Sequence, residues 1–205
     1  MTNDFLKYYK PSIIIAVIAV LAITIYLGVN YWKVSISIIS LITLFLTLND
    51  LLLWKYFPFS LMFWTHNFSG RYEGFLEYEY KDENFNTVKD RLKHVKVISQ
   101  TGSKISIYSF TWKKDGSLST SSVNKGIYVE KIEGGIHYQL IYNYLNDGNN
   151  DCGFPPHYGT EIIKFSEENN LKEIFGRYFT ERSPQQTRGK FLDMKWINNS
   201  MKHDF

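Results

Sequence analysis

The clearest candidates for chemistry lie near the C-terminus, where cations alternate with aromatic and hydroxyl side chains. Residues 176–190 carry three arginines and one lysine, together with Tyr178 and Thr180. Guanidinium groups pair with phosphates through two parallel hydrogen bonds, and aromatic rings stack on nucleobases. Alternate side chains of a strand share a face, so Tyr178, Thr180 and Arg182 are expected to look inward, and the cations at 177 and 190 to face solvent. The pattern favours a site for a small nucleotide.

Hydroxyl-bearing aromatic residues on other predicted strands extend this candidate site. Residues 70–80 alternate Tyr, Gly and Leu with Arg, Glu and Phe, which predicts a half-buried strand with an aromatic inward face. Tyrosine is also simply a good strand residue. The candidate ligand-binding set is Tyr72, Tyr78, Tyr108, Trp112, Tyr142, Tyr178, Thr180, Arg182 and Arg188.

The sequence offers little for catalysis or for metal binding. The five histidines are far apart, and no carboxylate cluster has the spacing of a metal site. No nucleophile elbow, phosphate-binding glycine loop or dinucleotide fingerprint is present. We therefore expect no catalytic residue, no metal and no cofactor, and predict that the chain is not an enzyme.

Composition excludes two further classes of protein. The 23 Lys and Arg residues balance 20 Asp and Glu and are spread along the chain, which disfavours binding to a DNA or RNA polymer. A single cysteine allows no intrachain disulfide and no Cys-based zinc site. The fold must therefore be held by its core.

The part of the chain that positions the candidate site is rich in strand signals. Nine alternating or apolar runs are separated by turn signals, with no helical stretch between them: residues 70–80, 93–100, 104–112, 118–123, 126–132, 136–145, 160–166, 171–180 and 189–197. Short connections favour a meander over a Greek-key sandwich, and closure removes the sheet edges. We expect a small eight-stranded up-and-down antiparallel β-barrel. Residues 91–101 and 160–166 fit either strand face.

The first third of the chain has the composition of a membrane-embedded segment. Residues 11–32 contain no charge, and a second apolar run covers residues 34–54 with one carboxylate near its end. A helix needs roughly 20 apolar residues to cross a bilayer core of about 30 Å. Aromatic residues cluster before, between and after these runs, as at membrane interfaces. We expect a transmembrane helical hairpin over residues 1–60, with spans at about 12–30 and 34–54, a juxtamembrane linker over 61–68 and a β-barrel over 69–205.

Two alternatives to this hairpin are weaker. A cleavable signal peptide lacks its small-residue cleavage site, and a second apolar run follows at once. A buried hairpin in a soluble protein would need more protein around it than residues 69–205 supply. Three lysines flank the open ends of the hairpin and one lies at its turn, which places both termini in the cytoplasm.

In architecture, the chain resembles the two-transmembrane β-barrel effectors of bacterial cyclic-oligonucleotide anti-phage systems (CBASS). The resemblance runs through the hairpin, the strand that opens Ser-Gly-Arg-Tyr-Glu-Gly at 69–74, and the late strand pair at 176–182 and 187–190. It implies a lipocalin-like cytoplasmic barrel that binds a cyclic dinucleotide made by a partner nucleotidyltransferase. It further implies homo-oligomerisation on activation and disruption of the bacterial inner membrane in abortive infection.

Three functions from different classes follow. The first is this anti-phage effector, an integral protein of the inner membrane. The second is a membrane-tethered, lipocalin-like module for another small ligand or lipid, without membrane disruption. The third is a membrane-anchored enzyme, which would need a catalytic constellation that the sequence does not show.

Overall fold

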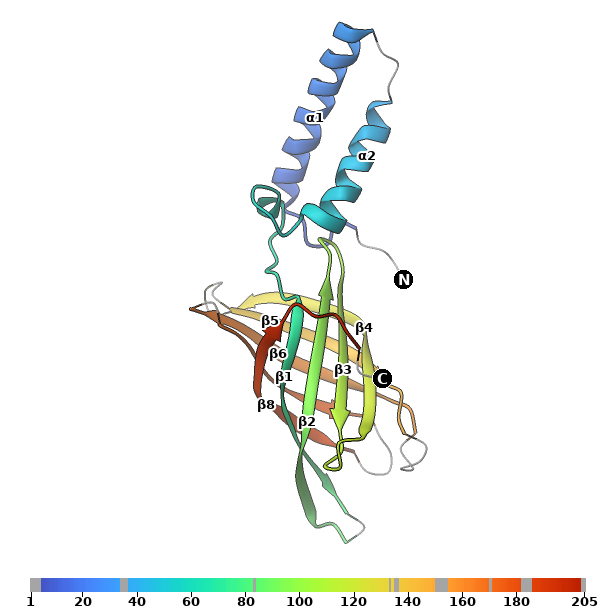
Figure 1. Cartoon of the computed structure of the whole chain (residues 1–205), viewed down its shortest axis with the longest axis vertical. Helices are drawn as coiled ribbons and strands as arrows, with labels where there is room; N and C mark the ends of the chain where they lie inside the picture. The colour runs from blue at the N-terminus through green and yellow to red at the C-terminus, as the bar shows by residue number, and fades with distance from the viewer. Residues whose placement is uncertain are drawn as a thin grey trace. The chain divides into compact units, whose positions relative to one another are not determined.

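The chain folds into a helical unit and a β-barrel unit. The computed structural model describes residues 5–33, 37–82, 84–132, 134, 137–149, 155–169, 171–181 and 186–203. The helical unit runs to Asn67 and includes the turn Gln100–Lys104, and the barrel unit holds the rest (Figure 1).

The helical unit contains one helix that is long and apolar enough to cross a membrane. Helix α1 spans Pro11–Trp32, and its candidate span is Pro11–Tyr31. At a rise of 1.5 Å per residue, its 22 residues extend about 33 Å. Proline suits the first turn, where no helical hydrogen bond is lost. This agrees with the predicted first span.

The second predicted span is shorter and less regular. Helix α2 covers Ile38–Leu48, with the Ser37 hydroxyl accepting a hydrogen bond from the Ser40 amide, and π-helix η1 continues over Asn49–Leu53. This apolar stretch of 16 residues extends about 24 Å, less than a bilayer core. The structure thus supports one spanning helix directly.

The C-terminal end of the second helical stretch is hydrogen-bonded to the turn Gln100–Lys104, which belongs to the same unit. The Asp50 carbonyl accepts the Gly102 amide at 2.9 Å, and the Ser103 hydroxyl donates to the Asp50 carboxylate at 3.0 Å. A Cβ at Gly102 would lie 2.5 Å from the Phe63 ring, so only glycine allows this close approach. A short 3₁₀ helix, η2 (Phe59–Met62), precedes Phe63.

The β-unit is a closed antiparallel barrel in which each strand neighbours the next and β8 closes on β1. The strands are β1 (Gly70–Lys81), β2 (Thr87–Gln100), β3 (Ile105–Trp112), β4 (Leu118–Ile132), β5 (His137–Asn146), β6 (His157–Glu168), β7 (Leu171–Thr180) and β8 (Arg188–Asn198). This confirms the predicted fold class.

Two predicted strands are one in the structure. The runs at 118–123 and 126–132 form β4, with a register shift against β5 between Asn124 and Gly126. The Asn124 side chain accepts the Ile107 amide at 2.8 Å and donates to the Ile105 carbonyl at 3.3 Å. The Asn124 side chain thus provides hydrogen-bond partners for the β3 backbone next to the bulge in β4.

One end of the barrel interior is filled. The residues there are large, apolar and at most 2% exposed: Phe68, Tyr72, Ile98, Ile107, Leu140, Ile163, Phe165, Ile174 and Met194. Tyr72 donates from its hydroxyl to the Phe68 carbonyl, and its ring lies edge-on to Phe165. Such close packing leaves no room for a ligand at this end.

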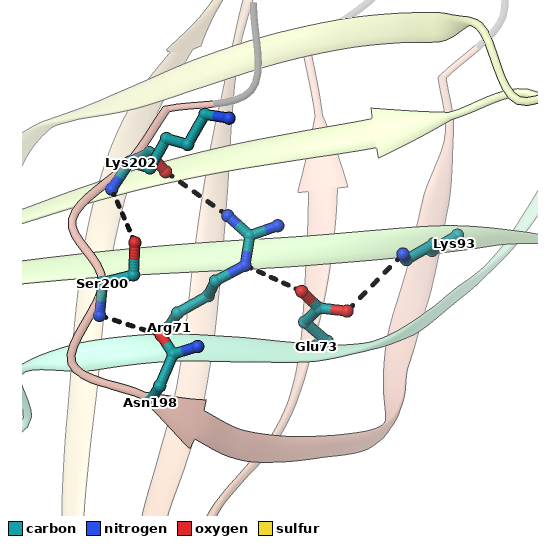
Figure 2. Close-up of polar contacts among 6 residues, drawn as sticks. All are labelled: Arg71, Glu73, Lys93, Asn198, Ser200 and Lys202. Atoms are coloured by element: carbon teal, nitrogen blue, oxygen red, sulfur yellow. Dashed lines mark hydrogen bonds and ion pairs between the residues drawn. The ribbon is translucent and has the colours of Figure 1, made fainter.

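A C-terminal segment covers part of the outer wall. Arg71 donates to Glu73 at 2.7 Å and to the Lys202 carbonyl at 3.3 Å, while Lys93 lies 3.5 Å from Glu73 (Figure 2). The ring of His203 packs on Tyr108 and Phe110. The outer face beneath is therefore partly buried, with Val95, Val97 and Phe110 as its core.

Candidate ligand-binding site

The other end of the barrel interior is hollow. A cavity of about 520 Å³ opens there, within the range that holds a small-molecule ligand. Its wall combines apolar and aromatic side chains with hydroxyl groups: Leu76, Tyr78, Leu92, Thr111, Thr120, Ser122, Tyr144, Tyr178, Thr180 and Phe191. At Gly159, a Cβ would lie 2.3 Å from the Tyr144 ring, so this glycine makes room for that ring.

A buried ion pair lies at the inner end of this cavity. The Lys96 ammonium donates to Glu161 Oε2 at 2.6 Å and to the Ser109 hydroxyl at 2.9 Å. The Tyr142 hydroxyl donates a short hydrogen bond to the same Oε2. Burial lowers the pKa of Lys96 and the nearby Glu161 carboxylate opposes that shift. We call Lys96, Ser109, Tyr142 and Glu161 the polar floor.

His94 borders the cavity beside this floor. Its Nδ1 lies 2.9 Å from the Thr111 hydroxyl, and its ring stacks on Phe191 at 5.2 Å. Burial, and then the positive charge of Lys96, hold the pKa of His94 well below its ordinary value. The imidazole is therefore neutral at physiological pH.

The rim of the cavity carries charges of both signs. Lys113, Lys114 and Asp115, in the turn between β3 and β4, border the cavity, as do Asp90 and His157. Lys114 and Asp90 form an ion pair at 2.7 Å with the lysine side chain 72% exposed. An exposed pair of this kind contributes little to stability, so the lysine can exchange its partner for a ligand phosphate.

Five of the nine residues predicted from the sequence have aromatic or hydroxyl groups inside the barrel. Tyr78, Tyr178 and Thr180 line the cavity. Tyr142 belongs to the polar floor, and Tyr72 lies in the packed end. Burial raises the pKa of Tyr178, as does the Glu161 charge, so its hydroxyl stays protonated.

Tyr108 and Trp112 were expected to face inward, but the structure places them on the opposite side of β3. Ser109 and Thr111 face the interior, where they bond Lys96 and His94. Tyr108 and Trp112 instead pack with Val95, Val97 and Phe110 on the outer wall. The reason is that the C-terminal segment covers this wall, which makes apolar residues favourable there.

Of the predicted cations, Arg188 does not border the cavity. Arg188 is an outer-wall residue with 77% of its side chain exposed, 2.5 Å from Glu79. Lys190 likewise pairs with Glu77 at 3.1 Å. Glutamates of β1 thus pair with Arg188, which the sequence suggested for phosphate, and with Lys190, which was expected to face solvent. Arg182 lies outside the described residues.

Sequence reasoning included Tyr142 but missed Lys96, Ser109 and Glu161 of the polar floor, and it missed His94. Lys96 and His94 lie in a segment whose facing was left open, and so does Glu161. The available signal was Lys96, a lone charge in the otherwise apolar stretch 95–98, because a charge there is buried only when it is paired. Glu161 gave no such signal, because Lys164 lies three residues after it in the same run. Within the described part of the chain, no group of three or more His, Cys, Asp or Glu residues could hold a metal ion.

Fold and cavity together define a small ligand-binding barrel, because an eight-stranded barrel encloses room for one small ligand when its interior is not filled. A family model, the Cap15 cyclic dinucleotide receptor domain, matches residues 63–195. The chain therefore belongs to the Cap15 cyclic dinucleotide receptor family. A comparison with curated proteins finds no match.

Proposed function

We propose that this protein is an anti-phage effector whose barrel binds a cyclic dinucleotide in the hollow end. The observation that carries the proposal is the cavity of about 520 Å³ inside a domain that the cyclic dinucleotide receptor family matches. Aromatic walls suit stacking on bases, and Lys113 and Lys114 at the rim suit phosphates.

The membrane part of the proposal rests on the helical unit. Helix α1 is long enough to cross a bilayer, and the shorter apolar stretch Ile38–Leu53 would return the chain if the bilayer thins locally. Both termini then lie in the cytoplasm, on the side where a partner nucleotidyltransferase makes the ligand. In this scheme the protein is a two-span protein of the bacterial inner membrane.

Ligand binding must favour an associated state if it is to act on the membrane, because a ligand shifts an equilibrium only by its differential affinity for the two states. We propose that bound subunits form homo-oligomers whose helices disrupt the inner membrane and stop the growth of infected cells.

The first test is a calorimetric titration of the full-length protein in detergent micelles with a panel of cyclic dinucleotides. Thr120 borders the cavity, so Thr120→Trp should fill it and abolish binding. Tyr128 lies on β4 with 59% exposure, so Tyr128→Trp is a matched control that should bind normally. Equal binding by both variants would contradict a site in this cavity.

The second test addresses the membrane. Full-length protein in phosphatidylethanolamine and phosphatidylglycerol vesicles should release an entrapped dye when the ligand that binds is added, and Thr120→Trp should not. Tight binding without dye release would instead favour the alternative function, a membrane-tethered, lipocalin-like module.

A further inference from the structure

One carboxylate oxygen of the polar floor, Glu161 Oε1, accepts no hydrogen bond from the residues that the structure describes. The hydrogen bonds that described residues make to Glu161 end on Oε2, from Lys96 and Tyr142. Glu161 borders the cavity, and its side chain is 5% exposed. Oε1 is therefore an acceptor at the inner end of the cavity, on a carboxylate that two donors hold in one orientation.

The surroundings of Glu161 favour a flat, aromatic ligand group. Tyr178 lies opposite Glu161 in the β6–β7 register, and Tyr144 and Phe191 also border the cavity. The Tyr178 and Phe191 rings are 6.0 Å apart between centroids. Such rings provide faces on which a nucleobase can stack.

The charges of the floor exclude a phosphate from this position. The Lys96 ammonium is occupied by Glu161 and Ser109, and it lies 4.2 Å from the centroid of the Phe191 ring. An incoming phosphate would meet the Glu161 carboxylate first, and like charges repel strongly in a site shielded from water. Phosphates are thus left to the rim, near Lys113 and Lys114.

We propose that Glu161 determines which cyclic dinucleotides bind, by accepting a hydrogen bond at Oε1 from the exocyclic amine of one nucleobase inserted toward the floor. This inference rests on the proposed function. Adenine, guanine and cytosine carry such an amine. In uracil, the N–H donor lies between two carbonyl oxygens, which the carboxylate repels. Ligands with at least one amine-bearing base therefore bind, and ligands with two uracils are rejected.

The experiment measures the binding of four ligands to the full-length protein in detergent micelles: cyclic di-AMP, cyclic di-GMP, cyclic UMP–AMP and cyclic di-UMP. The wild type should bind at least one amine-bearing ligand about tenfold or more tightly than cyclic di-UMP. Glu161→Gln offers an amide in place of the carboxylate, so the preference should fall to about one. The matched control is Glu130→Gln, a change on β4 where the glutamate bonds Gln139 and does not border the cavity.

A second variant protects the test against misfolding, since Glu161→Gln leaves the Lys96 charge without its carboxylate. Lys96→Met/Glu161→Gln leaves no charge in the floor and should also lose the preference. Retention of the wild-type preference by a folded variant, or equal binding of cyclic di-UMP by the wild type, would overturn the role of Glu161 and leave the proposed function standing. Failure of all four ligands to bind the wild type would overturn both.

Discussion

The two ends of the barrel interior have the same strand alternation and opposite contents. One end holds Tyr72, Phe165, Ile174 and their neighbours in close contact, whereas at the other end hydroxyl groups and rings surround a cavity. Because the alternation only decides which side chains point inward, the size and polarity of those side chains decide whether the interior is core or site. A pocket is therefore expected where the inward face of a barrel sequence lacks large apolar side chains.

The polar floor separates these two ends, and breaking it should have the largest effect on stability. Lys96→Met leaves the Glu161 carboxylate buried without its cation, so the free energy of unfolding should fall by about 3–5 kcal/mol. Chemical denaturation followed by tryptophan fluorescence measures the loss. Lys96→Met/Glu161→Gln should recover most of it, and equal losses in the single and double variants would show that the charge pairing is unimportant.

Truncation of one aliphatic residue at each end should sharpen the contrast. Ile174 is fully buried in the packed end, so Ile174→Ala should cost about 2–5 kcal/mol and leave ligand affinity unchanged. Leu92 borders the cavity, so Leu92→Ala should cost at most about 1 kcal/mol but weaken ligand binding. Denaturation and calorimetry on both variants test this, and similar stability losses would contradict the distinction between core and site.

Acid should weaken the hollow end through His94. Burial and Lys96 keep the pKa of His94 below its ordinary value, so the unfolded chain binds a proton below about pH 6.5 that the folded chain resists. Stability from this group is full above that pH and declines as the pH falls below it. Melting temperatures between about pH 7.5 and 5.5 should show the decline in the wild type and a flatter profile in His94→Gln. If the wild type and His94→Gln lose melting temperature identically as the pH falls, another titrating group causes the loss.

The smallest effect is expected on the outer wall. Arg188 and Glu79 form an exposed ion pair, so Arg188→Ala should change the free energy of unfolding by at most about 1 kcal/mol. Its affinity for the ligand should stay within about twofold of wild type, because the guanidinium does not border the cavity. A large loss of affinity would show that Arg188 contacts the ligand, as the sequence suggested.

Sequence patterns predicted the barrel because turn signals and alternation are local. They also predicted the inward face of β1, where charged residues at 71, 73, 77 and 79 mark the solvent side. They failed for β3, because the wall that carries Tyr108 and Trp112 is covered by the polar segment 199–203, whose docking has no local signature. An apolar residue marks burial, and a strand covered on both sides gives no sign of which side is the interior.

The surroundings of Arg188 and Lys190 were missed for a different reason. Proximity in the sequence placed cations together, but Glu79 and Glu77 reach these two from a strand that is distant along the chain and adjacent in the closed sheet. Such pairing depends on closure, which no local pattern encodes. The same holds for Lys96 and Glu161, which are 65 residues apart.

That last pair also bears on how the chain finds its fold. Strands β2 and β6 are not neighbours in the barrel, so Lys96 and Glu161 meet only once the intervening strands have assembled. A slip of one residue in either strand would turn its charge toward the outer wall and leave the other buried alone. Closure with the wrong register therefore carries the cost of an unpaired internal ion. The pair therefore favours, by the free energy of burying matched rather than unmatched charges, the register that aligns strands on opposite sides of the barrel.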